Sequence, residues 1–425
     1  MNTTLGNVFK GDKVIWMIFF FLCIISVVEV FSASSELTYK GGSYWAPMLK
    51  HFGILLMGVF SMVVTLNIQC RYFKIMTPFL LIISVATLLW VVVAGNATNG
   101  AQRWISFFGM QFQPSEIAKG TLVLATAQIL SAMQTEKGAD KHAFKYILWT
   151  SIPILLLIVR ENFSTAVLLG AVIIMMMIIG RVPMKLIGIL MGILMVILLA
   201  FLSFIMLAGH EQPTTDTGKN LTEQTAQAKI AEEEDDDGVF SSLFHRADTW
   251  KGRIIKFVNQ KEITPAEVDL DKDAQVAHAN IAIASSRIIG KGPGNSEERD
   301  FLSQAFSDFI YAIIIEELGI SGAIFVALLY IILLFRTGSI ATRCENNFPA
   351  FLAMGLALLL VTQALFNMCV AVGLVPVTGQ PLPLISKGGT STMINCIYIG
   401  VILSVSRSAK KKKETETQQS LQGIY

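Results

Sequence analysis

Residues 184–208 read MKLIGILMGILMVILLAFLSFIMLA, an apolar stretch in which Lys185 is the only charged residue. As a helix, about 20 apolar residues are long enough to cross the roughly 30 Å hydrocarbon layer of a bilayer. Similar stretches recur along the whole chain, and 15% of its residues are charged, against roughly a quarter in soluble domains. The sequence therefore predicts an all-α polytopic membrane protein and excludes a soluble globular fold.

Hydropathy predicts ten transmembrane helices. They lie at about 14–33, 48–68, 75–95, 115–133, 146–161, 163–180, 184–208, 309–335, 348–375 and 390–406. The fifth and sixth are short and close together, so they are compatible with a broken hairpin as well as with two separate crossings. Lys and Arg concentrate in alternate connecting segments, and the positive-inside rule therefore places both termini in the cytoplasm.

The predicted spans divide the chain into five parts. These are a cytoplasmic N-terminus (1–13), transmembrane helices one to seven (14–208), a large extracytoplasmic loop (209–308), transmembrane helices eight to ten (309–406) and a basic cytoplasmic tail (407–425). Residues 209–238 of the loop are polar and acidic, as expected of a disordered spacer. Residues 239–260 and 274–290 have helical apolar spacing, and the first of these segments is expected to lie on the outer membrane surface.

Composition limits the classes of partner and site. The net charge is +2 and nothing in its distribution indicates a nucleic-acid partner. The five cysteines fall in predicted spans or inner loops, so neither a disulfide framework nor a metal–thiolate site is indicated.

Ionisable residues in or near the spans are candidate functional residues, because burying them without a partner is expensive. They concentrate toward the outer face. Arg103 lies in the loop before the fourth span, and Glu116 and Lys119 lie at the start of that span. Glu116 also suits the first turn of a helix, whose N-terminus attracts negative charge. Lys119 lies about one turn inside an apolar helix and needs an anionic partner, either Glu116 or a ligand phosphate.

The loop before the tenth span reads VPVTGQPLPLISKGGTSTMIN, residues 375–395. Its prolines fix the backbone, and its Gly-Gly pair lets the main chain approach a ligand. A ligand-binding loop and a purely structural re-entrant turn are both compatible with this composition. Its candidate binding residues are Ser386, Lys387, Gly388, Gly389 and Thr390.

The eighth span begins with SDFIYAIIIEELG, residues 307–319, which contains three carboxylates. Asp308 suits either an N-cap or a general base. Glu316 and Glu317 point about 100° apart on a helix, so at least one requires a partner inside the bundle. A basic group from another span, such as Lys119, Arg160 or Lys387, would satisfy one of them. Arg, Lys and Asp side chains together at the outer face suit a lipid-linked pyrophosphate, whose phosphates the cations would hold.

Three segments in order, GAQRWISFFGMQFQPSEIAK (100–119), GKGPGNSEERDFLSQAFSDFIYAIIIEELGISG (290–322) and PVTGQPLPLISKGGTS (376–391), resemble the SEDS family of FtsW/RodA/SpoVE proteins. The resemblance covers about 100–400, and the ten-span count agrees with it. It implies a peptidoglycan glycosyltransferase that polymerises lipid II on the outer face of the bacterial cytoplasmic membrane. It also implies an uncleaved first span, a class B penicillin-binding transpeptidase as partner, and other membrane proteins of the division apparatus.

By this resemblance Asp308 is the aspartate that activates the C4 hydroxyl of the acceptor lipid II. Arg103 and Lys119 would steady the pyrophosphate, with or without a divalent cation such as Mg²⁺ or Mn²⁺, and the sequence identifies no metal. Apart from the resemblance, their place in the same helix leads us to expect Glu316 and Glu317 to be buried supports of Asp308, with Glu317 the more cavity-facing of the two.

The chain departs from the family pattern at two places. The family's QPDLGTA is RENFSTA at 160–166, so Asn162 replaces an aspartate, whose role we therefore expect to be structural or replaceable. The family's SYGGSS is SKGGTS, which adds Lys387. Chain length and loop form favour division at the septum over elongation. A lipid II flippase and a non-catalytic division scaffold are the alternatives, and the outward clustering of ionisable residues favours the enzyme.

Overall fold

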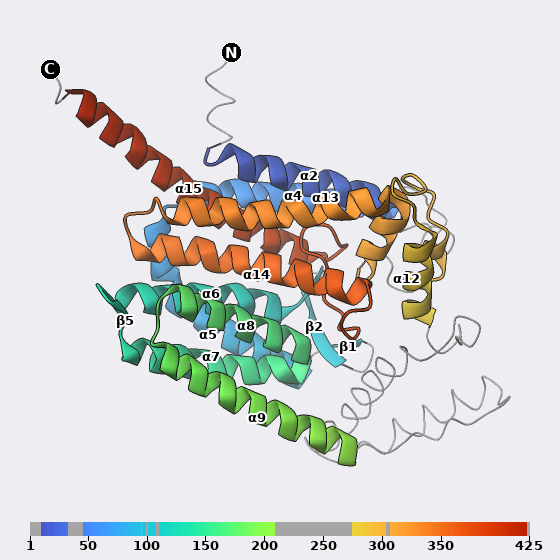
Figure 1. The fold of residues 1–425 in the computed structure, drawn as a ribbon, viewed down its shortest axis with the longest axis horizontal. Helices are drawn as coiled ribbons and strands as arrows, with labels where there is room; N and C mark the ends of the chain where they lie inside the picture. Colours follow the sequence, from blue (N-terminus) through green and yellow to red (C-terminus); the bar gives the residue numbers. More distant parts are fainter. Residues whose placement is uncertain are drawn as a thin grey trace. The chain divides into compact units, whose positions relative to one another are not determined.

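The computed structural model describes residues 10–32, 46–94, 96–98, 101–107, 110–208, 274–302 and 307–422. Within them, ten helices of 17 or more residues occupy the places of the ten predicted spans (Figure 1). They are α2 (Lys13–Ser32), α4 (Ala46–Asn67), α5 (Cys70–Ala94), α6 (Pro114–Ala132), α7 (Lys141–Glu161), α8 (Phe163–Ile179), α9 (Met184–Ala208), α13 (Ile310–Ala341), α14 (Asn347–Ala371) and α15 (Thr390–Gln422). Seven of them are long and apolar enough to cross a membrane. The prediction of an all-α polytopic membrane protein is confirmed.

The chain forms two compact units. The first contains Met1–Ile187, Asp269–Leu374 and Thr378–Tyr425, and the second contains Gly188–Val268 and Val375–Val377. The described part of the second unit is mainly the apolar helix α9, whose described side chains from Ile193 to Leu199 are exposed. The bundle and the candidate site described below belong to the first unit.

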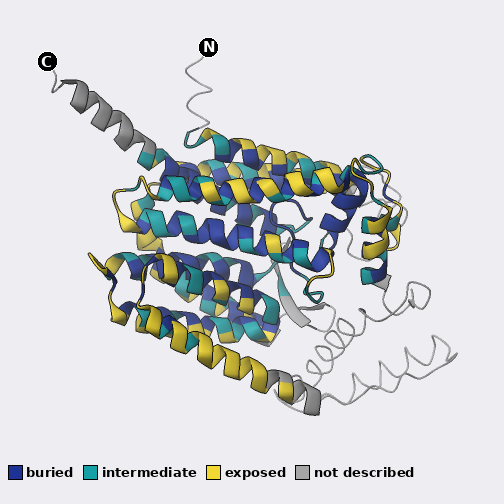
Figure 2. Ribbon diagram, viewed as in Figure 1, coloured by how far each residue is buried: buried dark blue, intermediate teal, exposed yellow. Residues whose placement is uncertain are grey.

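Helix α14 lies at the centre of the first unit and packs against α6, α8, α13 and α15. Figure 2 shows its surface as mostly buried, whereas α2 and α13 are exposed on one side. Helix α4 packs closely along α15, where Gly400 lies against the Met62 carbonyl oxygen. A Cβ at Gly400 would be 2.7 Å from that oxygen, so this small residue permits the close approach of the two backbones.

The two ends of the bundle differ in charge and in content. At one end, Arg336 at the end of α13 pairs with Asp12 before α2, with Nη2 2.7 Å from Oδ2. At the same end Arg407 of α15 donates to the Asn67 carbonyl at the end of α4. We call this the basic end. The other end, called the outer end below, contains the start of α13 and the short helix α12 (Ala274–Ser285) (Figure 1).

Five short strands add to the helices and correct the expectation that residues 95–114 are a plain loop. Strands β1 (Asn96–Thr98), β2 (Ala101–Phe107) and β3 (Met110–Phe112) form an antiparallel sheet in that order. Strand β4 (Gln134–Thr135) pairs with β5 (Gly138–Ala139). Thr98 pairs with Ala101, so Asn-Gly connects β1 to β2, and Asn-Gly is the pair that tight hairpins favour. Hydropathy over windows of span length misses strands this short.

Several predicted features lie outside the described residues. They are the acidic spacer 209–238, the surface helix 239–260 and the side chain of Arg103, whose backbone belongs to β2. Helix α12 lies within the predicted helical segment 274–290 and ends five residues earlier, at Ser285.

Candidate functional site

Asp308 lies at the outer end, directly before α13. The N-cap residue of α13 is Phe309, so Asp308 lies one residue before the position that the capping interpretation expects. Ser307 donates its hydroxyl to Asp308 Oδ1 at 3.1 Å. A Cβ at Gly379 would be 3.5 Å from Asp308 Oδ2, so the carboxylate lies against the main chain of the proline-rich loop. Gly379 has φ +69°, a conformation that favours glycine.

The main chain around Asp308 is fixed by Asn367 of α14 and by Ser386. Asn367 Nδ2 donates to the carbonyl oxygens of Asp308 (2.9 Å) and Gln380 (2.7 Å). Ser386 donates its hydroxyl to the Ser307 carbonyl and accepts from the Leu382 N–H, both at 2.7 Å. Residues 378–389, called the proline-rich loop below, are therefore joined to the start of α13 by hydrogen bonds on both sides of Asp308.

Lys119 reaches the same loop through Gln363 of α14. Its Nζ lies 2.8 Å from Glu116 Oε1 and 2.8 Å from Gln363 Oε1, and Gln363 Nε2 donates to the Pro381 carbonyl at 3.0 Å. Lys119 is 1% exposed. Of the two partners expected for Lys119, the structure contains Glu116. The ammonium group faces the bundle interior, where it holds the loop rather than meeting solvent.

A further contact to the loop comes from α8. Asn162 lies between α7 and α8 and is the N-cap residue of α8. Its Oδ1 accepts hydrogen bonds from the N–H groups of Ser164 (3.1 Å) and Thr165 (3.4 Å). Thr165 then accepts a hydrogen bond from Gln380 Nε2 at 2.8 Å. An aspartate oxygen would cap the helix equally well, which explains how Asn162 can stand in the family's aspartate position.

The second half of the proline-rich loop carries the other predicted binding residues. Lys387, Gly388, Gly389 and Thr390 are half-buried where the chain enters α15. Burial and the nearby ammonium of Lys50 lower the pKa of Lys387. The carbonyl of Ile385, two residues earlier, accepts from Ser26 of α2 at 2.7 Å.

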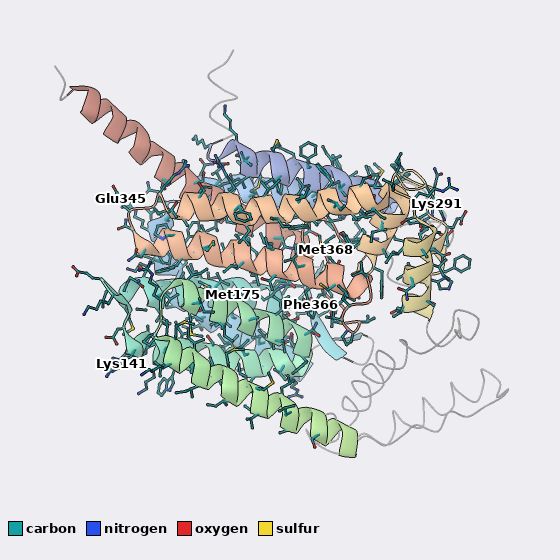
Figure 3. The ribbon with its side chains drawn as sticks, in the orientation of Figure 1. Lys141, Met175, Lys291, Glu345, Phe366 and Met368 are labelled. Atoms are coloured by element: carbon teal, nitrogen blue, oxygen red, sulfur yellow. The ribbon has the colours of Figure 1, made fainter. Side chains whose placement is uncertain are left out.

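Glu316 and Glu317 are fully buried. Their carboxylates form hydrogen bonds with residues 290–299, called the return turn below, and with Ser32. Glu316 Oε1 lies 2.8 Å from Lys291 Nζ and accepts from the Glu297 N–H at 3.1 Å. Figure 3 shows Lys291 at the outer end, away from Glu345. The expectation that another span supplies the basic partner is therefore wrong, because the large loop supplies it as the loop returns to the bundle.

Glu317 joins the return turn to α2. Its Oε2 accepts from the Gly294 N–H at 3.0 Å, and its Oε1 accepts from the Ser296 N–H at 3.3 Å and from the Ser32 hydroxyl. Arg299 donates to the Ser32 hydroxyl at 3.1 Å. Both glutamates thus hold main chain and loop side chains in place.

Sequence reasoning missed Gln363, Asn367, Gln380 and Thr165. The signal for the first two was present: they are polar, lie four residues apart on one helical face and interrupt an apolar span. Gln380 and Thr165 show no comparable pattern, since only the fold brings them together.

The fit of a divalent cation can be tested against the described side chains. Among the residues that the structure describes, no three His, Cys, Asp or Glu side chains come together as a metal site. The described arrangement presents one half-buried carboxylate, Asp308, on a main chain that several helices fix, which suits proton transfer to or from a bound hydroxyl.

Known proteins resemble this chain over nearly its whole length. The FtsW/RodA/SpoVE family model, described as "Cell cycle protein", matches residues 12–221 and 238–411. The chain is 29% identical over 412 residues to the "Probable peptidoglycan glycosyltransferase FtsW" of Geobacter metallireducens, covering 96% of this chain and 97% of that protein. It is 26% identical over 401 residues to the "Peptidoglycan glycosyltransferase MrdB" of Escherichia coli K12, covering 94% of each.

The fold is also similar to a chain in a solved structure, "Structural coordination of polymerization and crosslinking by a peptidoglycan synthase complex". The TM-score is 0.67 at 20% identity, covering 94% of this chain and 98% of the other.

Proposed function

This chain belongs to the FtsW/RodA/SpoVE family of cell cycle proteins, and we propose that it is a peptidoglycan glycosyltransferase that polymerises lipid II. Two relatives that match it over more than nine-tenths of its length carry the name peptidoglycan glycosyltransferase. The reaction would take place at the outer face of the bacterial cytoplasmic membrane, where the outer end of the bundle would lie.

The observation that carries the proposal is the setting of Asp308. Its main-chain carbonyl is held by Asn367, and a Cβ at Gly379 would lie 3.5 Å from its Oδ2. The hydroxyl of Ser386 holds the carbonyl of the preceding residue. A general base must be held within hydrogen-bonding reach of the proton that it removes, and a fixed main chain provides that constraint.

In the proposed reaction Asp308 accepts the proton of the C4 hydroxyl of the acceptor lipid II. The hydroxyl oxygen attacks the anomeric carbon of the donor and forms the new glycosidic bond. The bond from that carbon to the pyrophosphate oxygen breaks, undecaprenyl pyrophosphate leaves with the bonding electron pair, and the anomeric centre inverts.

We assign pyrophosphate binding to the cations of the outer end. Lys387 lies near another ammonium, that of Lys50, and a phosphate beside both would offset their mutual repulsion. Ser386, Gly388, Gly389 and Thr390 would position the same group by hydroxyl and N–H contacts, and Arg103 would add a bidentate contact. Lys119 and Glu116, buried against Gln363, would act by holding the proline-rich loop.

We further propose a role in septal synthesis with a class B penicillin-binding transpeptidase and other membrane proteins of the division apparatus. The name FtsW of the Geobacter relative supports the division role. The structurally similar chain comes from a complex whose description joins polymerisation to crosslinking, which supports a crosslinking partner.

The test is lipid II polymerisation by the purified full-length protein, with and without the transpeptidase, read as glycan length on a gel. Asp308→Asn keeps the size of the side chain and removes its basicity. We expect a rate loss of about 10²–10⁴-fold, the usual contribution of a general base. Asp300→Asn, the same change on an exposed outer carboxylate, is the control and should retain activity.

Thermal unfolding in detergent would show whether Asp308→Asn is folded. Wild-type activity in a folded Asp308→Asn protein would remove Asp308 from the mechanism. If wild type forms no polymer in the presence of its partner and lipid II, the proposed glycosyltransferase activity is contradicted. That result would favour a flippase or a scaffold.

A further inference from the structure

A short turn of the large loop exposes two isoleucines at the outer end. Ile288 is 73% exposed and Ile289 is 82% exposed, and the side chain of Arg287 before them is also exposed. Turns that face water are normally polar, and exposed neighbouring apolar side chains usually mark a contact surface. We call residues 287–289 the isoleucine tip.

Main-chain hydrogen bonds place the isoleucine tip beside α13. The N–H of Ile320 donates to the Arg287 carbonyl (3.3 Å), and the N–H of Ser321 donates to the Ile288 carbonyl (3.2 Å). Ser321 adds a hydroxyl contact to the same oxygen at 2.9 Å. The tip is thus level with the first residues of α13 after its break at Gly319.

The part of α13 after that break has the length of one membrane crossing. From Ile320 to Ala341 it rises about 33 Å at 1.5 Å per residue, close to the roughly 30 Å of the hydrocarbon layer. A crossing of this length would place Ile320, and the isoleucine tip beside it, near the outer boundary of the hydrocarbon.

The tip also continues the lipid-facing side of α13. Ile320, Ile324 and Leu328 are large, exposed and four residues apart, so they form one apolar stripe along the helix. The tip meets α13 at the outer end of this stripe, through its bonds to Ile320 and Ser321. Because the isoleucines adjoin the outer end of this apolar stripe, they are placed to face the same lipid as the helix.

The exposure of the tip is built into the backbone. Gly290, with φ +79°, and Gly319, with φ +71°, lie against each other, and a Cβ at Gly319 would be 2.3 Å from the Ile288 carbonyl oxygen. Beyond the tip, the N–H groups of Lys291 and Gly292 donate to the carbonyls of Glu316 and Glu317 at 2.9 and 2.8 Å. These contacts hold the main chain of the tip against α13, with both isoleucine side chains exposed.

We propose that the isoleucine tip is a lipid anchor in the outer leaflet, with Ile288 and Ile289 at the acyl boundary. Arg287 would contact the phosphates of anionic headgroups, as basic residues beside interfacial apolar side chains do. The anchor holds the returning end of the large loop at the membrane surface, ahead of Asp308 in the chain. It is independent of the proposed glycosyltransferase activity.

The test measures the depth of a probe at the tip. Ile289→Cys, labelled with an environment-sensitive fluorophore, is reconstituted in nanodiscs of equal phosphatidylcholine and phosphatidylglycerol carrying a nitroxide near the headgroup or near the end of the acyl chain. The native cysteines are buried or half-buried, and the unsubstituted chain measures any background labelling. Glu297→Cys on the return turn is the water-exposed control, and Leu328→Cys on α13 is the lipid-exposed control.

We expect the nitroxide near the headgroup to quench the probe at 289 at least about twofold more than the probe at 297, as for an interfacial side chain. The nitroxide near the chain end should quench 328 more than 289. In a second measurement, Arg287→Gln should reduce the difference in quenching at 289 between nanodiscs with and without phosphatidylglycerol. Equal quenching of the probes at 289 and 297, with the probe at 328 quenched, would overturn the lipid anchor. It would instead favour contact of the tip with a protein partner.

Discussion

At the scale of single residues, the buried polar side chains of the outer end mostly bind main chain. Asn367 donates to two carbonyls, Gln363 to one, and Ser386 joins a carbonyl and an N–H. The main chain of the proline-rich loop lacks the regular hydrogen bonds of a helix or a strand. Leaving its N–H and C=O groups unpaired away from water would cost free energy. These three side chains therefore allow irregular backbone to be buried beside Asp308.

Asn367→Asp tests this role with almost no change in size. The substitution replaces the donor shared by two carbonyls with an oxygen that repels them, so we expect a loss of about 2–4 kcal/mol of unfolding free energy. Polymerisation should fall with it, because the main chain of Asp308 is released. Thermal unfolding in detergent measures the first effect. Asn346→Asp, at the exposed N-cap of α14, is the matched control and should be nearly neutral; an equal loss there would show a general effect of charge.

A second residue-scale prediction concerns pH and Lys291. Hydrogen bonding to Glu316 raises the pKa of Lys291 above its ordinary value of 10.5, despite partial burial. A group whose folded pKa is raised stabilises the fold fully below its unfolded pKa, and the stabilisation is lost as the pH rises through the folded value. At neutral pH we expect Lys291→Met to cost about 2 kcal/mol.

The measurement is thermal unfolding of wild type and Lys291→Met from neutral pH to above 10.5. The difference between their unfolding temperatures should narrow at the upper end, because only wild type has an ammonium at position 291 to lose there. Glu297→Gln removes the exposed partner of Lys291 and should cost less than about 1 kcal/mol at any pH. A difference independent of pH would mean that Lys291 acts through packing alone.

At the scale of elements, α13 is two helical pieces joined at Gly319. The first piece, residues 310–318, is buried on nearly all sides and carries Glu316 and Glu317, and the second forms the membrane crossing. Gly319, with φ +71° and ψ −174°, turns the chain between them. The break lets the large loop return beside α13 and meet both glutamates.

Gly319→Ala should therefore be severely destabilising. Its Cβ would be 2.3 Å from the Ile288 carbonyl oxygen, in a backbone conformation that side chains disfavour, so we expect a loss above about 3 kcal/mol or no folded protein. Gly170→Ala is the control, since nothing lies within 4 Å of a Cβ there and alanine favours helix, which predicts a gain of up to about 1 kcal/mol. The yield of monodisperse protein and its unfolding temperature compare the two, and equal behaviour would refute the close approach of Gly290 and Gly319.

At the scale of the whole molecule, the bundle has a basic end and an outer end. The first contains two separate contacts, Arg336 with Asp12 and Arg407 with the Asn67 carbonyl. The second contains α12 and the start of α13. A membrane protein retains Lys and Arg preferentially on the cytoplasmic side. This polarity supports the proposed orientation, with Asp308 facing the compartment where the cell wall is assembled.

Reporter fusions test this orientation directly. Green fluorescent protein at either terminus should fluoresce, and alkaline phosphatase inserted after Thr225 should be active, because the termini are expected in the cytoplasm and the large loop outside. An alkaline phosphatase inserted after Lys137, in the connection between α6 and α7, is the control and should be inactive. The reverse pattern would contradict the orientation and the proposed site of catalysis.

The sequence alone determines where the chain crosses the membrane and which residue types are available for chemistry. Span length and hydropathy are local properties, because each crossing must satisfy the bilayer by itself, and so the ten helices lie close to their predicted places. The tertiary structure alone decided the pairings. Lys119 meets Gln363, 244 positions away, and Glu316 meets Lys291 where a cation from another span was expected. Such contacts depend on how the helices pack and on where a helix is interrupted, and local hydropathy predicts neither.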